Sequence, residues 1–244
     1  MPKNVMQPLF TCLSPALLKH YDVSNSIVVI IDVLRATSTI ATALANGAKC
    51  VVPVDSVAEC IRIGKQIEAV TAGERDGKIA EGLQYGNSPF DYPKSFIKNK
   101  TLVLTTTNGT RLLHMALDKG AKEIITGAFA NLQSVSSYLM KKNMPVVLAC
   151  AAWKDKINIE DSLFAGAVIE ALKGHFEVKC DSSKIAHNLY SLAKDNFFEF
   201  MKLNNASHYE RLTKFGIEKD IIHCLTENTA DVLPIYKEGK LILI

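Results

Sequence analysis

The chain has 244 residues, of which 48% are hydrophobic and 22% are charged, and its formal net charge is +3. This is an ordinary globular balance with enough apolar material for a substantial core. The net charge is small, and the chain has no basic run and no interleaved aromatic residues. We therefore expect neither a nucleic-acid partner nor an anionic membrane partner. The six cysteines form no C-x-x-C pair, so they indicate no metal framework. No apolar stretch of about 18 residues occurs, and residues 1–10 lack the features of a signal peptide, so we expect a cytoplasmic protein.

Apolar runs and helix-start signals alternate along the chain. Strands are predicted at residues 27–31, 50–54, 70–72, 101–105, 123–126, 146–150 and 176–180. Helices are predicted at residues 37–46, 56–69, 109–119, 131–141, 160–173, 183–201, 205–214 and 218–225. A hairpin is predicted over 232–244, with its turn at 237–240.

These repeated strand–helix–strand units predict an α/β fold. We expect three layers, α/β/α, around a mixed and largely parallel sheet. No Pro/Gly/Ser-rich linker divides the chain, so a single domain over residues 1–244 is expected.

A weak internal repeat links two of these units. Residues 43–49 (ALANGAK) resemble residues 116–122 (ALDKGAK), within strand–helix–strand units at 27–54 and 101–127. Chance similarity between two ordinary units is the alternative to a duplication. If the repeat is real, Asp32 aligns with Thr105, and the two polar turns lie at equivalent strand ends.

The first polar turn follows the β-branched strand at 27–31. It contains Asp32 and Arg35, and then a Thr-Ser-Thr cluster that can open a helix. Ligands of open α/β sheets bind at the carboxyl ends of strands. An acid and a guanidinium in that position suit a Mg²⁺ ion and a phosphate ester. The alternative is structural: Asp32 caps the helix and Arg35 pairs with it.

A second polar turn follows the strand that ends at residue 105. It contains Thr106, Thr107, Asn108, Gly109 and Arg111. Hydroxyl groups, an amide, a flexible glycine and a guanidinium at a strand-to-helix turn can form an anion cradle. The Asn-Gly step is also compatible with an ordinary turn.

Further acids occur in two other segments. A glycine-rich loop at 73–89 carries Glu74, a candidate metal ligand, and Arg75, a candidate anion ligand, unless it is a plain surface loop. Glu160 and Asp161 begin a predicted helix, where acids complement the helix dipole. Either acid could also complete a metal shell together with Asp32 and Glu74.

Four segments, in this order, closely resemble the 2-phosphosulfolactate phosphatase family. They are residues 31–39 (IDVLRATST), 73–75 (GER) with 86–89 (GNSP), 105–111 (TTTNGTR), and 160–161 (ED) with 165–167 (AGA). The resemblance spans nearly the whole chain. It implies a Mg²⁺-dependent phosphatase that hydrolyses 2-phospho-3-sulfolactate to 3-sulfolactate and phosphate, a step of coenzyme M biosynthesis.

The implied substrate is a small anionic phosphate ester with a carboxylate and a sulfonate. Arg35, Arg75 and Arg111 offer planar guanidinium groups that suit these oxyanions. One departure from the family affects the substrate. Where the family tends to carry a small, glycine-containing turn, this chain has Trp153 and Lys154, so its substrate can differ if this turn lines the pocket.

The expected chemistry is metal-assisted phosphoryl transfer. Mg²⁺ would be held by Asp32 and by one or more of the candidate ligands Glu74, Glu160 and Asp161, and the catalytic group would be Asp32, Arg35 and Glu74. The nucleophile is either metal-bound water or Asp32 itself. The alternatives are a phosphatase for another small phosphorylated hydroxy acid and a non-catalytic anion-binding protein. The sequence leaves open whether the protein forms a homo-oligomer.

Overall fold

The computed structural model describes residues 6–243 and contains one mixed sheet of 11 strands. The strand order across the sheet is β5-β4-β6-β3-β11-β10-β7-β2-β8-β1-β9. The strands are β1 (Gln7–Cys12), β2 (Ile27–Ile31), β3 (Cys50–Pro53), β4 (Val70–Arg75), β5 (Lys78–Ile79), β6 (Thr101–Thr105), β7 (Glu123–Gly127), β8 (Val146–Cys150), β9 (Phe176–Val178), β10 (Ile235–Lys237) and β11 (Lys240–Ile242).

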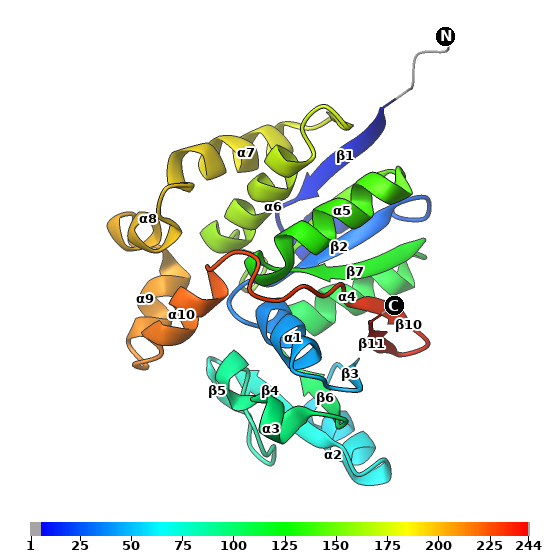
Figure 1. Ribbon diagram of the computed structural model, residues 1–244, viewed down its shortest axis with the longest axis vertical. Coiled ribbons are helices and arrows are strands. Elements are labelled where there is room, and N and C mark those ends of the chain that lie inside the picture. Colours follow the sequence, from blue (N-terminus) through cyan, green and yellow to red (C-terminus); the bar gives the residue numbers. More distant parts are fainter. Residues whose placement is uncertain (1–5, 244) are drawn as a thin grey trace.

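Helices cover both faces of this sheet, which confirms the three-layer α/β/α prediction (Figure 1). The α-helices are α1 (Ala36–Ala45), α2 (Val57–Gln66), α3 (Lys94–Ile97), α4 (Gly109–Asp118), α5 (Leu132–Lys142), α6 (Ile159–Ala171), α7 (Asp181–Ala193), α8 (Phe197–Leu203), α9 (Ser207–Thr213) and α10 (Glu218–Cys224). Short 3₁₀ helices occur at Pro15–His20, Pro89–Asp91 and Phe129–Asn131. Among residues 6–243, no helix is long and apolar enough to cross a membrane.

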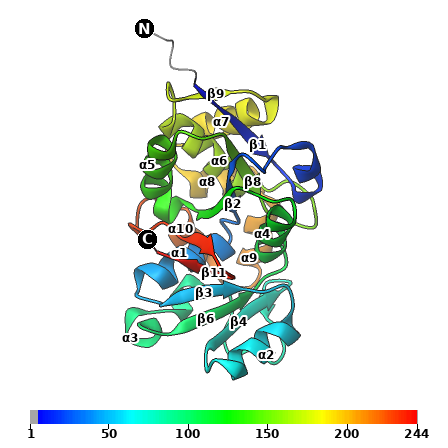
Figure 2. The ribbon, with the colours of Figure 1, turned by 90° about the vertical axis from the view of Figure 1, so that its right-hand side faces the viewer.

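The sheet consists of two parallel blocks joined by a hairpin, with β5 as an antiparallel edge strand on β4. One block contains β4, β6 and β3, and the other contains β7, β2, β8, β1 and β9. The predicted hairpin is present as β10 and β11, which pair antiparallel with β7 and β3 respectively. Figure 2 shows this hairpin between the two blocks. Residue 244, predicted at the hairpin's end, and residues 1–5 of the N-terminal segment lie outside the described residues.

Strand β2 explains why both faces of the sheet are covered. All five of its residues are buried, and alternate residues of a strand point to opposite faces. Val29 packs in a cluster that includes Phe164 of α6, whereas Val28 packs in a second cluster that includes Leu112 of α4. A continuous β-branched run is the pattern expected of a strand buried on both sides.

Two sequence predictions need correction. The helix predicted over 183–201 is wrong as one helix, because α7 ends at Ala193 and α8 begins at Phe197. Asn196 causes the new start, since its side chain accepts a hydrogen bond of 3.0 Å from the backbone N–H of Glu199. Strand β1 was not predicted, because Pro8 and its polar neighbours interrupt the apolar pattern, yet it pairs with both β8 and β9.

Candidate active site

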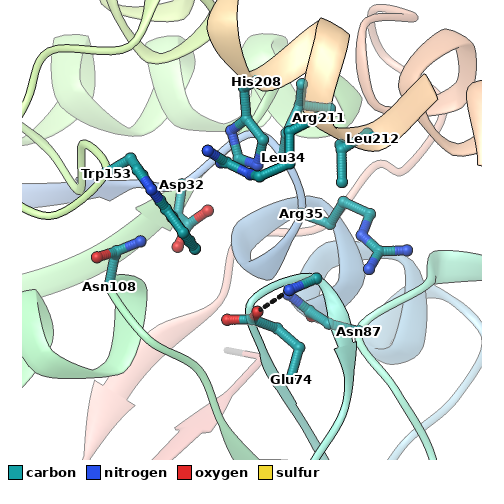
Figure 3. A pocket seen from close by; sticks show the side chains of 11 residues that line it. Asp32, Leu34, Arg35, Glu74, Asn87, Asn108, Trp153, His208, Arg211 and Leu212 are labelled. Atoms are coloured by element: carbon teal, nitrogen blue, oxygen red, sulfur yellow. Dashed lines mark hydrogen bonds between the residues drawn. The ribbon is translucent and has the colours of Figure 1, made fainter. Parts of the chain in front are cut away.

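A pocket lies where polar turns from both blocks of the sheet meet helix α9 (Figure 3). Its cavity volume is about 20 Å³, so the lining side chains lie close together. The pocket is lined by Asp32, Leu34, Arg35, Glu74, Gly77, Asn87, Asn108, Trp153, His208, Arg211 and Leu212. The carboxyl ends of β2 and β6 therefore meet at one site, although these strands belong to different blocks.

Asp32 lies directly after β2 and packs against the start of α4. A Cβ atom added to Gly109 would lie only 2.7 Å from Asp32 Oδ2, so Gly109 is needed because the carboxylate approaches the backbone closely. The pKa of Asp32 is raised to about 6, chiefly by burial; His208 lowers it, and the Glu74 and Glu160 carboxylates raise it. Asp32 is thus a partly buried carboxylate that gains from a nearby cation or a proton.

The hydroxyl cluster after Asp32 organises the turn. Thr37 Oγ1 accepts a hydrogen bond of 3.1 Å from the Asp32 backbone N–H, and Ser38 Oγ donates to the Val33 carbonyl at 2.8 Å. Thr39 Oγ1 donates to the carbonyl of Asn87, at 2.9 Å, and so fixes a second pocket residue. These side chains bond to the backbone and shape the site.

Glu74, near the end of β4, joins two loops at the pocket wall. Its Oε1 accepts hydrogen bonds from the backbone N–H and the hydroxyl of Thr107, at 3.0 and 2.9 Å, and its Oε2 accepts from the Gly77 N–H at 2.9 Å. Thr106 bonds instead with Thr110. Only Asn108 of the predicted anion cradle lines the pocket, because the donors of Thr107 are directed to Glu74.

Arg35 is the pocket-lining member of the three predicted arginines. Its Nη1 donates to Asp220 Oδ2 at 2.5 Å, and both side chains are buried. Arg75 donates to the Glu74 carbonyl and to a threonine hydroxyl, and it does not line the pocket. Arg111 is half-exposed and pairs with Asp155 at 3.4 Å, also outside the lining residues. The predicted cluster of three substrate-binding arginines is therefore not assembled.

Asp161 and Glu160 each form hydrogen bonds or an ion pair with other groups of the protein. Asp161 accepts hydrogen bonds from the backbone N–H groups of Val33, at 2.9 Å, and Ala152, at 3.1 Å, and so ties together the turns after β2 and β8. Burial, with the nearby Glu160 and Asp32 carboxylates, raises the pKa of Asp161 well above its usual value. Glu160 Oε1 pairs with His208 Nδ1 at 2.5 Å, and its buried Oε2 has no hydrogen-bond partner.

The four predicted metal ligands therefore do not form one cluster. Within residues 6–243, no group of three or more His, Cys, Asp or Glu side chains is arranged to hold a metal ion. Asp32 and Glu74, however, both line the pocket. Mg²⁺ is commonly bound by one or two protein carboxylates together with water and substrate phosphate oxygens, and this smaller donor set fits such a site.

Helix α9 supplies pocket residues that the sequence analysis missed. His208 and Arg211 face the pocket from this helix (Figure 3). The Arg211 guanidinium lies over the Trp153 ring, with its central carbon 3.7 Å from the ring centroid. The helix itself was predicted, but no local motif marked these side chains. Trp153 lines the pocket, so the turn that departs from the family's pattern is part of the site.

Comparisons with known proteins identify the family of this chain. Residues 12–239 match the family model described as 2-phosphosulpholactate phosphatase. A protein of Caldanaerobacter subterraneus subsp. tengcongensis, named "Probable 2-phosphosulfolactate phosphatase", is 40% identical over 91% of this chain and 96% of its own length. Proteins with the same name from Clostridium novyi and Thermotoga petrophila are 35% and 39% identical, over 94% and 88% of this chain and 97% and 91% of their own lengths. The chain belongs to the 2-phosphosulfolactate phosphatase family.

Proposed function

We propose that this protein hydrolyses 2-phospho-3-sulfolactate to 3-sulfolactate and phosphate and that it requires Mg²⁺. The relatives' shared name supports the reaction. The observation that carries the proposal for this chain is the pocket itself, which is lined by the partly buried carboxylate Asp32 together with Glu74, Asn108 and two arginines. Acids and guanidinium groups on opposing turns are the groups that phosphoryl transfer requires.

The charge balance of the pocket supports the need for a divalent cation. Asp32 and Glu74 are two carboxylates, and the charge of Arg35 is already balanced by Asp220. This leaves Arg211 as the lining guanidinium outside the ion pairs found in residues 6–243. A phosphate ester that carries two further anionic groups would be repelled by the carboxylates unless a cation lay between them.

Each lining group then has a task in the reaction. Asp32 and Glu74 would hold Mg²⁺, which supplies neutralisation of the phosphate charge and a more acidic bound water. Asn108 offers its amide to a phosphate oxygen, and Arg35, fixed by Asp220, offers its remaining N–H groups. The ester P–O bond breaks as an oxygen nucleophile bonds to phosphorus, and the sulfolactate alkoxide takes up a proton.

We favour water over Asp32 as the nucleophile. The position two residues after Asp32, where a second acid could assist a phosphorylated aspartate, is Leu34, an apolar pocket residue. Borohydride reduces an acyl phosphate, so mass spectrometry of protein quenched during turnover distinguishes the two routes. Conversion of Asp32 to homoserine shows that Asp32 attacks, whereas an unmodified Asp32 supports attack by water.

The test of the function is phosphate release from 2-phospho-3-sulfolactate with and without EDTA. We expect activity to disappear in EDTA and to return with excess Mg²⁺. Asp32→Asn should lower kcat by about 100-fold or more, because a charge that acts on the reacting group is lost. Asp181→Asn, an exposed acid at the start of α7, is the matched control and should retain wild-type activity. Full activity of Asp32→Asn would remove Asp32 from the chemistry.

A second candidate is a phosphatase for another small phosphorylated acid. Trp153, which lines the pocket, is the observation that favours it, since a bulky ring alters the space available to the substrate. Turnover of phosphosulfolactate, phospholactate and phosphoglycerate under the same conditions decides between the substrates. If none releases phosphate with Mg²⁺ while 3-sulfolactate still binds, the protein binds anions without catalysis.

A further inference from the structure

Arg211 has an unsatisfied hydrogen-bond donor inside the pocket. Its guanidinium lies 3.7 Å from the centroid of the Trp153 ring, and its Nη2 atom is buried without a hydrogen-bond partner. Because a buried N–H group without an acceptor is unfavourable, such a group in a pocket indicates a missing ligand atom. The acceptor would be an oxygen of the substrate.

The neighbouring acids do not satisfy this donor. Glu160, Glu74 and Asp32 lie close enough to raise the pKa of Arg211, although burial lowers it more strongly. Yet Glu160 is paired with His208, and Glu74 accepts its hydrogen bonds from backbone and hydroxyl groups. Arg211 therefore keeps a free N–H edge, and the nearby carboxylates offset part of the cost of burying its charge.

The rest of the pocket already accounts for the phosphate. Asp32, Glu74 and Asn108 come from turns of the sheet, whereas Arg211 comes from α9 and is stacked on Trp153. The proposed substrate places a sulfonate on the carbon next to the one that carries the phosphate. Its two anionic groups beyond the phosphate thus need donors other than those of the sheet turns.

A sulfonate suits this guanidinium better than a carboxylate does. The guanidinium group is planar and weakly hydrated, and stacking on an indole ring fixes its plane and removes further water. A sulfonate is permanently ionised and presents three oxygens in a tetrahedral arrangement, so one of them can accept from a fixed N–H without a second matching donor. We propose that Arg211, oriented by Trp153, binds the substrate's sulfonate and thereby selects the sulfonated substrate. This inference rests on the proposed function.

Trp153 has the role of a positioning residue in this proposal. The turn that carries it is closed by two backbone hydrogen bonds between Trp153 and Lys156, at 2.8 and 2.9 Å. Lys154 in the same turn forms an exposed ion pair with Asp76 at 3.5 Å. The ring is thus held by its own turn, and Arg211 gains a fixed surface on which to stack.

The test compares two substrates in two proteins. With phosphosulfolactate, Arg211→Gln should lower kcat/KM by roughly 10- to 100-fold, mainly through KM, because a charge-assisted hydrogen bond to the substrate is lost. With phospholactate, which lacks the sulfonate, the same variant should stay within about threefold of wild type. Arg62→Gln, an exposed arginine on α2, is the control and should change neither value.

Two further variants separate binding from structural damage. Arg211→Lys keeps the charge but loses the planar fork, so it should also lose selectivity for the sulfonated substrate. Trp153→Phe retains a ring for stacking and should largely preserve that selectivity, whereas Trp153→Ala should not. Unfolding temperatures identify any variant whose fold is damaged.

The possible outcomes separate the two proposals. An equal loss with both substrates means that Arg211 binds the phosphate or the carboxylate and overturns the inference, as does no loss at all. If the wild type releases no phosphate from phosphosulfolactate, the proposed function fails by itself. Calorimetric binding of 3-sulfolactate and lactate then still tests Arg211: weaker binding of 3-sulfolactate alone to Arg211→Gln supports the sulfonate site, and unchanged binding refutes it.

Discussion

Asp161→Asn tests whether this buried acid is a structural clamp or a metal ligand. In the structure its two oxygens accept separate hydrogen bonds from the backbone N–H groups of Val33 and Ala152. An asparagine has one acceptor oxygen, so it can serve only one of these groups, and its own amide would face the other. Since the Asp161 side chain is 1% exposed, no bulk water can replace the lost acceptor.

The expected cost follows from that geometry. Leaving one buried N–H unpaired costs about 1–3 kcal/mol. For a chain of this size each kcal/mol lowers the unfolding temperature by about 2–4 °C, so Asp161→Asn should unfold roughly 2–12 °C below wild type in metal-free buffer. Differential scanning calorimetry measures this shift, and Asp181→Asn on the surface of α7 serves as the control that should not move.

If Asp161 is instead a metal ligand, we expect a change in the Mg²⁺ requirement and no change in the unfolding temperature. A lost ligand should raise the Mg²⁺ concentration needed for half-maximal activity by about tenfold or more. If Asp161→Asn keeps the wild-type unfolding temperature in EDTA and shows that rise, the clamp is refuted and the acid belongs in the metal site.

Two more predictions concern the environment of Asp32. Because its folded pKa is raised from 3.8 to about 6, the folded protein binds this proton more tightly than the unfolded chain does. As the pH rises from about 4 to about 6, the metal-free wild type should therefore lose up to roughly 3 kcal/mol of its free energy of unfolding. Asp32→Asn should not show this loss. Urea unfolding across this pH range measures the free energy of unfolding of both proteins. If it changes with pH in the same way in wild type and in Asp32→Asn, the raised pKa of Asp32 is refuted. Gly109→Ala introduces a Cβ atom 2.7 Å from Asp32 Oδ2 and 3.1 Å from the Ala36 Cβ, so the carboxylate must move and phosphate release should fall by about 100-fold. Gly120→Ala, whose Cβ would meet nothing within 4 Å, should lose stability because of its φ of +72° but keep its kcat, and equal activity of both variants would show that the contact is unimportant.

The elements of this fold could be predicted because their signals are local. The buried run before Asp32 is followed directly by a helix start, and strand β2 has the predicted bounds. Asn196 was overlooked as a helix start, since a capping asparagine within an apolar pattern interrupts it by only one residue. The pairing of β1 depends on two strands distant in sequence, which no local pattern reveals.

The site was harder to predict than the fold. The sequence analysis named Asp32 and Glu74 because each follows a predicted strand, and both line the pocket. It could not tell that Arg111 points to solvent, since side-chain direction depends on the helix's orientation. Nor could it find His208 and Arg211, because no local motif on α9 marks these side chains as pocket residues.

The hairpin of β10 and β11 also constrains the order in which the protein can be completed. It follows every other strand in the chain, yet it fills the middle of the sheet between β3 and β7. During synthesis, both of those strands keep an unpaired edge until residues 235–242 have emerged. Exposed edges are templates for pairing with other chains, so this protein is most prone to aggregate while residues 235–242 are not yet in place. These two strands thus close the vulnerable gap at the sheet's centre.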